Sequence, residues 1–146
     1  MSLIYILSLS LDPNTKIVNP KVKLGIKKTI STAAADDVLW LDMDSIFGPD
    51  CYLAKVEWTK EGDALVAQIL DRRQKKLALV MFDAVSGART TLHMEEASDK
   101  SWVNLNDSFR VLNYIPGDKL RFLWASEIDG FRHLYVREIN LSDPSS

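Results

Sequence analysis

Apolar and polar side chains alternate with a period of two through most of the chain, which is typical of strands buried on one face. The alternation is clearest where Val22, Leu24 and Ile26 are separated by lysines. The segment 64–70 is instead almost wholly apolar, which indicates a strand covered on both faces. The pattern predicts strands over 22–29, 38–43, 52–58, 64–70, 77–82, 89–94, 109–114, 120–125 and 132–139.

Helical periodicity is nearly absent, because no stretch longer than about ten residues shows the 3.6-residue period of an amphipathic helix. The segment 31–37 (STAAADD) is the one candidate helical turn, and a loop is the equal alternative there. The sequence therefore predicts an all-β protein.

A weak internal repeat organises the predicted strands. Residues 56–65 align with 111–120, so that the turn Gly62-Asp63 coincides with Gly117-Asp118. Repeats of four-stranded antiparallel units indicate a β-propeller, and this chain holds roughly two to two and a half such blades. We expect the blades at about 19–48, 52–97 and 101–146. Incomplete blades leave unpaired strand edges, which predicts that the isolated chain self-associates.

Composition narrows the classes of partner. The chain has 146 residues and a net charge of −2, which argues for one domain and against general nucleic-acid binding. No run reaches the ~18 apolar residues that a membrane-spanning helix needs. The single cysteine, Cys51, excludes an intrachain disulfide and is expected to be a small buried side chain. These features do not indicate a cellular compartment.

The sequence does not match the motifs of known catalytic and metal sites. There is no Gly-x-Ser-x-Gly sequence, and His93, His133 and Cys51 are too far apart in sequence to favour a zinc site. The segment 42–46 begins like a calcium loop but has Ile46 at a ligand position. The pair Glu95-Glu96 is interpreted as solvated turn residues. The residues alone predict no catalytic group, no metal and no cofactor, and they favour a non-catalytic β module over a small carbohydrate- or metal-binding domain.

Several segments together resemble a known family, the N-terminal β-propeller region of the dipeptidyl peptidase IV family of prolyl-oligopeptidase-type serine peptidases. The segments are 19–26 (NPKVKLGI), 52–62 (YLAKVEWTKEG), 71–74 (DRRQ), 101–107 (SWVNLND) and 122–135 (FLWASEIDGFRHLY). The resemblance runs from about residue 19 to 139. Residues 1–18 match less well and are interpreted as local variation or a cloning remnant.

The resemblance implies a parent serine exopeptidase that releases N-terminal Xaa-Pro or Xaa-Ala dipeptides. In that family the propeller caps an α/β-hydrolase domain, which carries the Ser, Asp and His of the triad and would lie beyond this chain. The chain alone is then inactive, and its role is to gate and position peptide substrates. The alternative is a stand-alone β-sheet module that binds other proteins and has no link to a peptidase.

By position, the resemblance places Asn106 and Asp107, and secondarily Asn104, near the substrate. The competing interpretation is that Asn and Asp side chains cap a turn there. The family's glutamate pair, which binds the substrate's ammonium group, lies upstream of the matched region, so Glu95-Glu96 is not assigned that role. Trp58, Trp102 and Trp124 are expected to fill the space between sheets.

Overall fold

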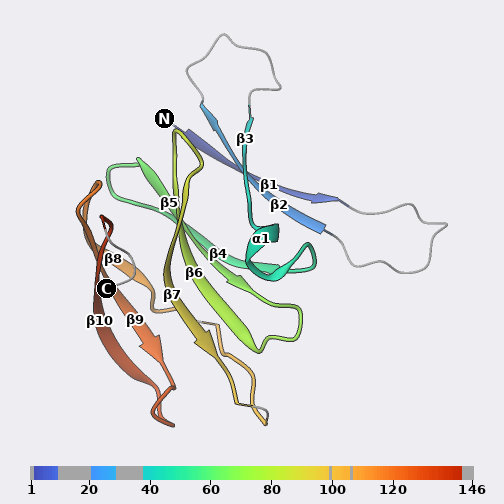
Figure 1. Cartoon of the computed structure of the whole chain (residues 1–146), viewed down its shortest axis with the longest axis vertical. Coiled ribbons are helices and arrows are strands. Elements are labelled where there is room, and N and C mark those ends of the chain that lie inside the picture. The colour runs from blue at the N-terminus through green and yellow to red at the C-terminus, as the bar shows by residue number, and fades with distance from the viewer. Residues whose placement is uncertain (1, 10–20, 29–37, 99, 106, 143–146) are drawn as a thin grey trace, which may run out of the picture.

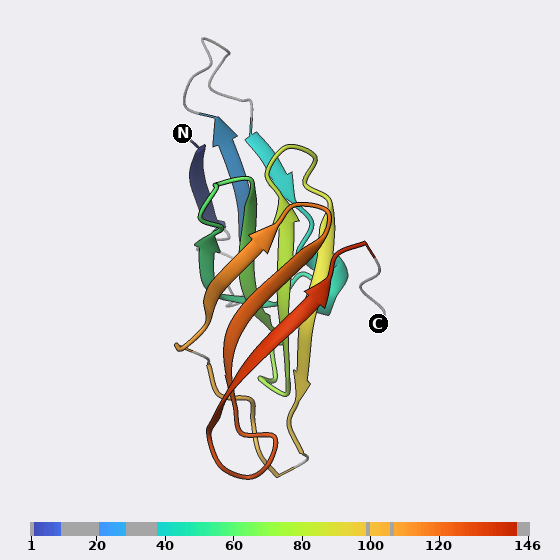
Figure 2. The same cartoon turned by 90° about the vertical axis from the view of Figure 1, so that its left-hand side faces the viewer.

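The computed structural model describes residues 2–9, 21–28, 38–98, 100–105 and 107–142. These residues form three antiparallel sheets stacked side by side (Figures 1 and 2). The first sheet has the order β1 (Ser2–Leu9), β2 (Lys21–Lys28), β3 (Val38–Leu41). The second has the order β4 (Tyr52–Trp58), β5 (Ala64–Leu70), β6 (Lys76–Asp83), β7 (Arg89–Glu96). The third has the order β10 (His133–Asn140), β9 (Lys119–Ser126), β8 (Arg110–Ile115).

The two central strands of the second sheet, β5 and β6, are buried on both faces, as the continuous apolar run over 64–70 predicts. Alternate side chains of β5 enter two separate cores. Leu65, Ala67 and Ile69 pack in the core shared with the first sheet, where Leu24, Ile26 and Leu41 lie. Ala64, Val66 and Leu70 pack in the core shared with the third sheet. Burial of one such aliphatic side chain stabilises a fold by about 1.5–3 kcal/mol. Because β5 buries side chains in both cores, the second sheet holds the first and third sheets in place.

The internal repeat is confirmed at the hairpin turns. The backbone carbonyl of Asp63 accepts a hydrogen bond from the N–H of Ala84 at 2.9 Å, and the carbonyl of Asp118 accepts one from Leu141 at 2.6 Å. Each donor follows the third strand of its sheet, so β10 corresponds to β6. Gly62 and Gly117 have φ angles of 75° and 71°, which favour glycine over other residues. The fold is thus all-β and consistent with part of a β-propeller, as predicted.

The third sheet has one strand fewer than the second. In the second sheet β7 pairs with the outer edge of β6, but β10 is the last strand of its sheet among the residues that the structure describes. On the outer face of this sheet Leu112, Leu134 and Val136 are exposed. Leu134 and Val136 take the second and fourth positions of β10, as the fully buried Leu77 and Leu79 do in β6.

Three features differ from the sequence analysis. A strand not foreseen there, β1, lies within the segment 1–18 and pairs along its length with β2. A short helix, α1 (Asp44–Phe47), follows β3, and the Asp42 carboxylate accepts a 3.1 Å hydrogen bond from the N–H of Ser45. Trp102 does not fill the space between sheets, because 68% of it is exposed. Trp124 is fully buried, and Trp58 packs against the core shared by the first and second sheets.

Two predictions about the organisation of the chain are not tested by the described residues. The candidate helical turn at 31–37 lies outside the described residues, and the division into blades at 19–48, 52–97 and 101–146 stays a prediction. Among the elements described, no helix has the length and apolar character to cross a membrane.

Candidate functional site

Three chain segments meet at one end of the stacked sheets, which we call the lower end because it points down in Figures 1 and 2. They are the β5–β6 hairpin, the described residues of the segment after β7 (97–98 and 100–105), and the β9–β10 hairpin at 127–132. The turns β4–β5, β6–β7 and β8–β9 lie at the opposite end. This division follows from antiparallel pairing, since successive connections alternate between the two ends.

Backbone hydrogen bonds hold Ala97 and Val103, both in the described part of the segment after β7, against the β5–β6 hairpin. The N–H of Ala97 donates to the carbonyl of Lys75 at 2.7 Å, and the N–H of Val103 donates to the carbonyl of Gln74 at 2.8 Å. The Lys75 ammonium donates to the carbonyls of Ser98, at 3.0 Å, and of Ser101. The side chain of Val103 is buried in the core shared by the second and third sheets. The segment is therefore a fixed wall.

A cleft of about 500 Å³ lies between this wall and the β9–β10 hairpin. Its lining combines carboxylates, hydroxyls and apolar groups. The lining residues are Glu95, Glu96, Ala97, Ser98, Ser101, Trp102, Val103, Asn104, Leu105, Ala125, Ser126, Glu127, Ile128, Gly130 and Arg132. A second cleft, of about 430 Å³, lies on the other side of residues 102–105 and is bounded by Tyr52, Leu53, Ala54, Leu70 and Gln74.

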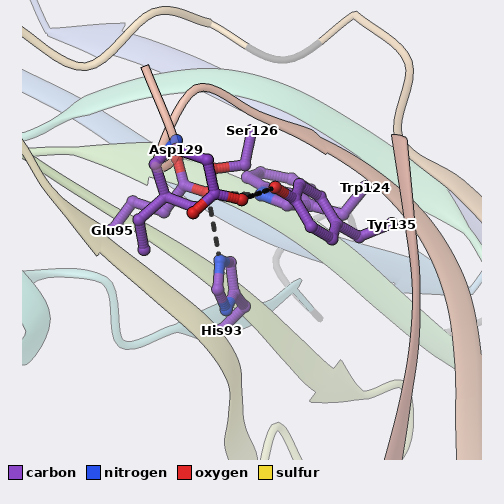
Figure 3. A network of polar contacts seen from close by, with 7 residues as sticks. His93, Glu95, Trp124, Ser126, Asp129 and Tyr135 are labelled. Carbon is purple, nitrogen blue, oxygen red and sulfur yellow. Dashed lines mark hydrogen bonds and ion pairs between the residues drawn. The ribbon is translucent and has the colours of Figure 1, made fainter. Parts of the chain in front are cut away.

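A polar network reaches the larger cleft through Glu95 and Ser126 (Figure 3). Glu95 on β7 accepts a 2.7 Å hydrogen bond from the indole N–H of Trp124 on β9. The Nε2 atom of His93 lies 3.2 Å from the same carboxylate oxygen, and the His93 ring meets the Trp124 ring edge-on at 5.4 Å. The side chains of His93 and Glu95 are each only 15% exposed. The network thus joins the second and third sheets where their lower ends meet.

The environment of Glu95 favours its ionised form. Burial acts to raise the pKa of the Glu95 carboxyl, but hydrogen bonds from His93, Ser126 and Trp124 outweigh it and lower the pKa below its ordinary value. The cleft therefore contains a fixed negative charge at neutral pH.

Further contacts shape the β9–β10 hairpin. The hydroxyl of Ser126 accepts a 3.2 Å hydrogen bond from the N–H of Ile128. The hydroxyl of Tyr135 donates to the Asp129 carboxylate across the hairpin, which raises the pKa of Tyr135 (Figure 3). The Asn104 amide donates to the Glu127 carboxylate at 2.9 Å and so ties the two walls of the cleft together.

The candidate substrate residues fall in different places. Asn104 lines both clefts. Asp107 is exposed in the turn before β8 and is not among the lining residues. Asn106 lies outside the described residues. Their contact with a substrate stays a prediction.

The interpretation of Glu95-Glu96 as solvated turn residues is wrong. Both lie on β7, where Glu96 points outward and forms a 3.2 Å ion pair with Lys76, whereas Glu95 points into the network. Sequence analysis also missed Ser126 and Glu127. For Glu95 a signal was available in the sequence. The period of two continues past residue 94 and puts Glu95 on the same face of the strand as His93.

Two other kinds of reactive group, a free thiol and a metal site, can be assessed among the described residues. Cys51 is buried, as predicted, and burial, followed by the nearby Asp44 and Asp50 charges, raises the pKa of its thiol. A thiol held in its neutral form is a poor nucleophile. No group of three or more His, Cys, Asp or Glu residues is placed to hold a metal within the described part of the chain. What the site can do is present a polar, negatively charged cleft edged by apolar side chains.

Comparison with solved structures supports the fold. A putative dipeptidyl aminopeptidase IV from Bacteroides ovatus superposes with a TM-score of 0.62 at 21% identity, covering 99% of this chain and 20% of that one. Dipeptidyl peptidase 4 from Porphyromonas gingivalis gives a TM-score of 0.61 at 17% identity, covering 92% of this chain and 19% of that one.

Sequence comparison gives the family. Dipeptidyl peptidase 8 from mouse is 29% identical over 149 aligned residues, and the human protein is 28% identical. Each alignment covers 84% of this chain but only 17% of the relative's length. The family model for the dipeptidyl peptidase IV N-terminal region matches residues 13–145. The chain therefore belongs to the dipeptidyl peptidase IV family, within that family's N-terminal region.

Proposed function

We infer that this chain is a non-catalytic propeller segment of a serine exopeptidase that releases N-terminal Xaa-Pro or Xaa-Ala dipeptides. The family match over residues 13–145 carries this proposal. The curated relatives bear the name dipeptidyl peptidase 8, and the chain spans 17% of their length. Its partners are then peptide substrates and an α/β-hydrolase domain of the same parent protein.

The lower-end cleft is the part of this chain that meets substrate in the proposal. The cleft is lined from both sides, and a hydrogen bond between Asn104 and Glu127 connects its two walls. A cleft with polar groups on both walls supports substrate binding, because catalysis depends on how a substrate is held. Asn104 lines the cleft, while Asp107, and by sequence alone Asn106, complete the proposed substrate-facing set.

The test compares this chain with the full-length protein, using an alanyl-prolyl amide as substrate. The full-length protein should release the dipeptide, and residues 1–146 alone should not. Hydrolysis by the short chain would overturn the non-catalytic role. Absence of dipeptide release by the full-length protein would overturn the peptidase link and favour an autonomous protein-binding module.

Substrate positioning has its own test in the full-length enzyme. Asn104→Ala and Asp107→Ala should raise KM with little change in kcat, because they would remove binding that is equal in ground and transition states. Asn113→Ala is the matched control, since Asn113 is exposed on β8 and is not a cleft residue. Equal KM values for all three variants and the wild type would exclude these residues from substrate binding.

Self-association of the isolated chain is part of the same proposal. The outer edge of β10 has no partner strand among the described residues, and open edges of this kind pair with other chains.

A further inference from the structure

We propose that Glu127 is a positioning residue, whose carboxylate holds the Asn104 side chain so that the amide oxygen faces the second cleft. There this oxygen accepts a hydrogen bond from a backbone N–H of the bound peptide, beyond the bond that is cleaved. The inference rests on the proposed function, and it adds the chemical group of the substrate that the site recognises.

The contact between these two side chains sets which way the Asn104 amide points. An ionised carboxylate only accepts hydrogen bonds, whereas an amide has a donating NH2 group and an accepting oxygen. The 2.9 Å contact therefore joins the Asn104 nitrogen to Glu127, because the amide oxygen would repel the carboxylate. The Asn104 oxygen is turned away from Glu127, and no residue in the described part of the chain donates a hydrogen bond to it.

Both partners extend from fixed points of the backbone. On one side, Asn104 follows Val103, whose side chain is buried and whose N–H is hydrogen-bonded to the β5–β6 hairpin. On the other side, Glu127 follows the buried Ser126, and its own carbonyl accepts a 2.9 Å hydrogen bond from the N–H of Gly130. Side-chain rotation is therefore what decides the orientation of the amide, and the Glu127 carboxylate restricts this rotation.

The second cleft offers a place for the free oxygen. Asn104 lines both clefts, whereas Glu127 lines only the larger one. The second cleft has a volume of about 430 Å³ and apolar walls that include Leu53, Leu70 and Trp102. Binding clefts typically combine apolar walls with a few polar groups that fix the orientation of the ligand. An acceptor held on such a wall selects a ligand that carries a donor.

A peptide needs such an acceptor when its backbone enters an apolar cleft, because a buried N–H without a partner costs free energy. The second cleft has two other side-chain acceptors, the Tyr52 hydroxyl and the Gln74 amide, but a carboxylate orients the Asn104 amide. In an Xaa-Pro substrate the proline nitrogen carries no hydrogen. The resemblance assigns the terminal ammonium to a glutamate pair outside the matched region. The donor is therefore an N–H of the residues that follow the released dipeptide.

The experiment uses the full-length protein and a pair of peptides. One is Ala-Pro-Ala-Ala-Ala, and the other carries methyl groups on the backbone nitrogens of its fourth and fifth residues. For the methylated peptide the wild type should have a KM about three- to tenfold higher and a kcat within about twofold, because one hydrogen bond is lost equally from the bound substrate and the transition state. The Asn104→Ala variant should treat the two peptides alike within about twofold.

Two variants at Glu127 separate the orientation of the amide from the bridging of the cleft walls. Glu127→Lys keeps a group that can bond to Asn104, but an ammonium only donates, so the amide oxygen turns to it and the discrimination between the peptides should disappear. Asn104→Asp/Glu127→Gln reverses the polarity of the contact and leaves one carboxylate oxygen as an acceptor for the substrate. This double variant should keep the discrimination. Glu138→Lys, the same change of charge at an exposed residue of β10, should keep it too.

The results distinguish this inference from the proposed function. A wild type that is active on both peptides with the same KM would overturn the acceptor role of Asn104 and leave the proposed function in place. Equal discrimination by the wild type, Asn104→Ala and Glu127→Lys would show that methylation acts elsewhere, and would also overturn the inference. A wild-type protein that releases no dipeptide from either peptide would overturn the proposed function, and with it the role of both residues.

Discussion

The indole N–H of Trp124 donates a 2.7 Å hydrogen bond to the carboxylate of Glu95. Trp124 belongs to β9 of the third sheet and Glu95 to β7 of the second, so this contact crosses the boundary between two sheets. The hydrophobic effect is not directional, so a hydrogen bond adds a specific alignment to the apolar packing between the two sheets. The hydrogen bond from the fully buried Trp124 ring to the charged Glu95 oxygen contributes to the relative position of the two sheets beside the cleft.

Replacing Trp124 by phenylalanine should destabilise the protein by about 1–3 kcal/mol. The change keeps an aromatic ring but removes the donor, so that a largely buried carboxylate loses a hydrogen-bond partner. Urea unfolding measures the difference. Trp102→Phe is the control, because Trp102 is mostly exposed and should unfold like the wild type. Equal unfolding midpoints for both variants would show that the Trp124–Glu95 bond does not contribute to stability.

Acid should weaken the contact at Glu95. The folded-state pKa of Glu95 is lowered from its ordinary value of 4.5, so the unfolded chain binds the proton more readily than the folded one. The resulting stability is fully present above about pH 4.5 and is lost as the pH falls through the folded-state value.

The Glu95→Gln variant isolates this effect. It should be less stable than the wild type at pH 6 by on the order of 1 kcal/mol, and the difference should shrink towards pH 3. Urea midpoints across this range give the measurement. Glu96→Gln is the matched control, since Glu96 is exposed and its surface ion pair with Lys76 contributes little. A difference between wild type and Glu95→Gln that stays constant with pH would contradict the assignment.

Gly25 is required by close packing between neighbouring strands. A Cβ atom at this position would lie 2.6 Å from Cγ1 of Val38 and 3.0 Å from the Trp40 ring on β3. Gly25→Ala should therefore destabilise the protein by about 1–3 kcal/mol, the usual cost of overpacking. Lys23→Ala, an exposed change on the same strand, is the control. Adding Val38→Ala should recover part of the loss, and thermal unfolding that ranks Gly25→Ala with Lys23→Ala would contradict the expected clash.

Much of the fold could be predicted from periodicity and turn residues. Strands such as 52–58 and 64–70 are specified by alternation or by continuous apolar runs, and Gly62 and Gly117 mark turns that few other residues can form. The strand β1 was missed because an apolar segment near the start of a chain can also have a role outside the folded domain, and its residue types alone do not separate the two cases. The helix α1 was missed because four residues are too few to show a helical period.

The site was less accessible to prediction, for a physical reason. Glu95, Ser126 and Glu127 come together with Asn104 only because two sheets stack, and stacking leaves no local pattern in the sequence. Trp102 shows the opposite error, since tryptophan is usually at least partly buried, whereas this one lies outside both cores. Residue type gave the right expectation for Trp124 and the wrong one for Trp102.

The edge of β10 gives the last prediction, that residues 1–146 alone self-associate. A partner strand would complete the hydrogen bonding of β10 and place its own side chains beside Leu134 and Val136, which are 65% and 53% exposed. The double variant Leu134→Lys/Val136→Lys should shift light scattering towards the monomer, because lysines at a strand edge oppose pairing between chains. Val85→Lys adds charge at a comparably exposed residue away from that edge and should leave the association unchanged. A wild-type chain that stays monomeric at high concentration would show that the open edge is protected in another way.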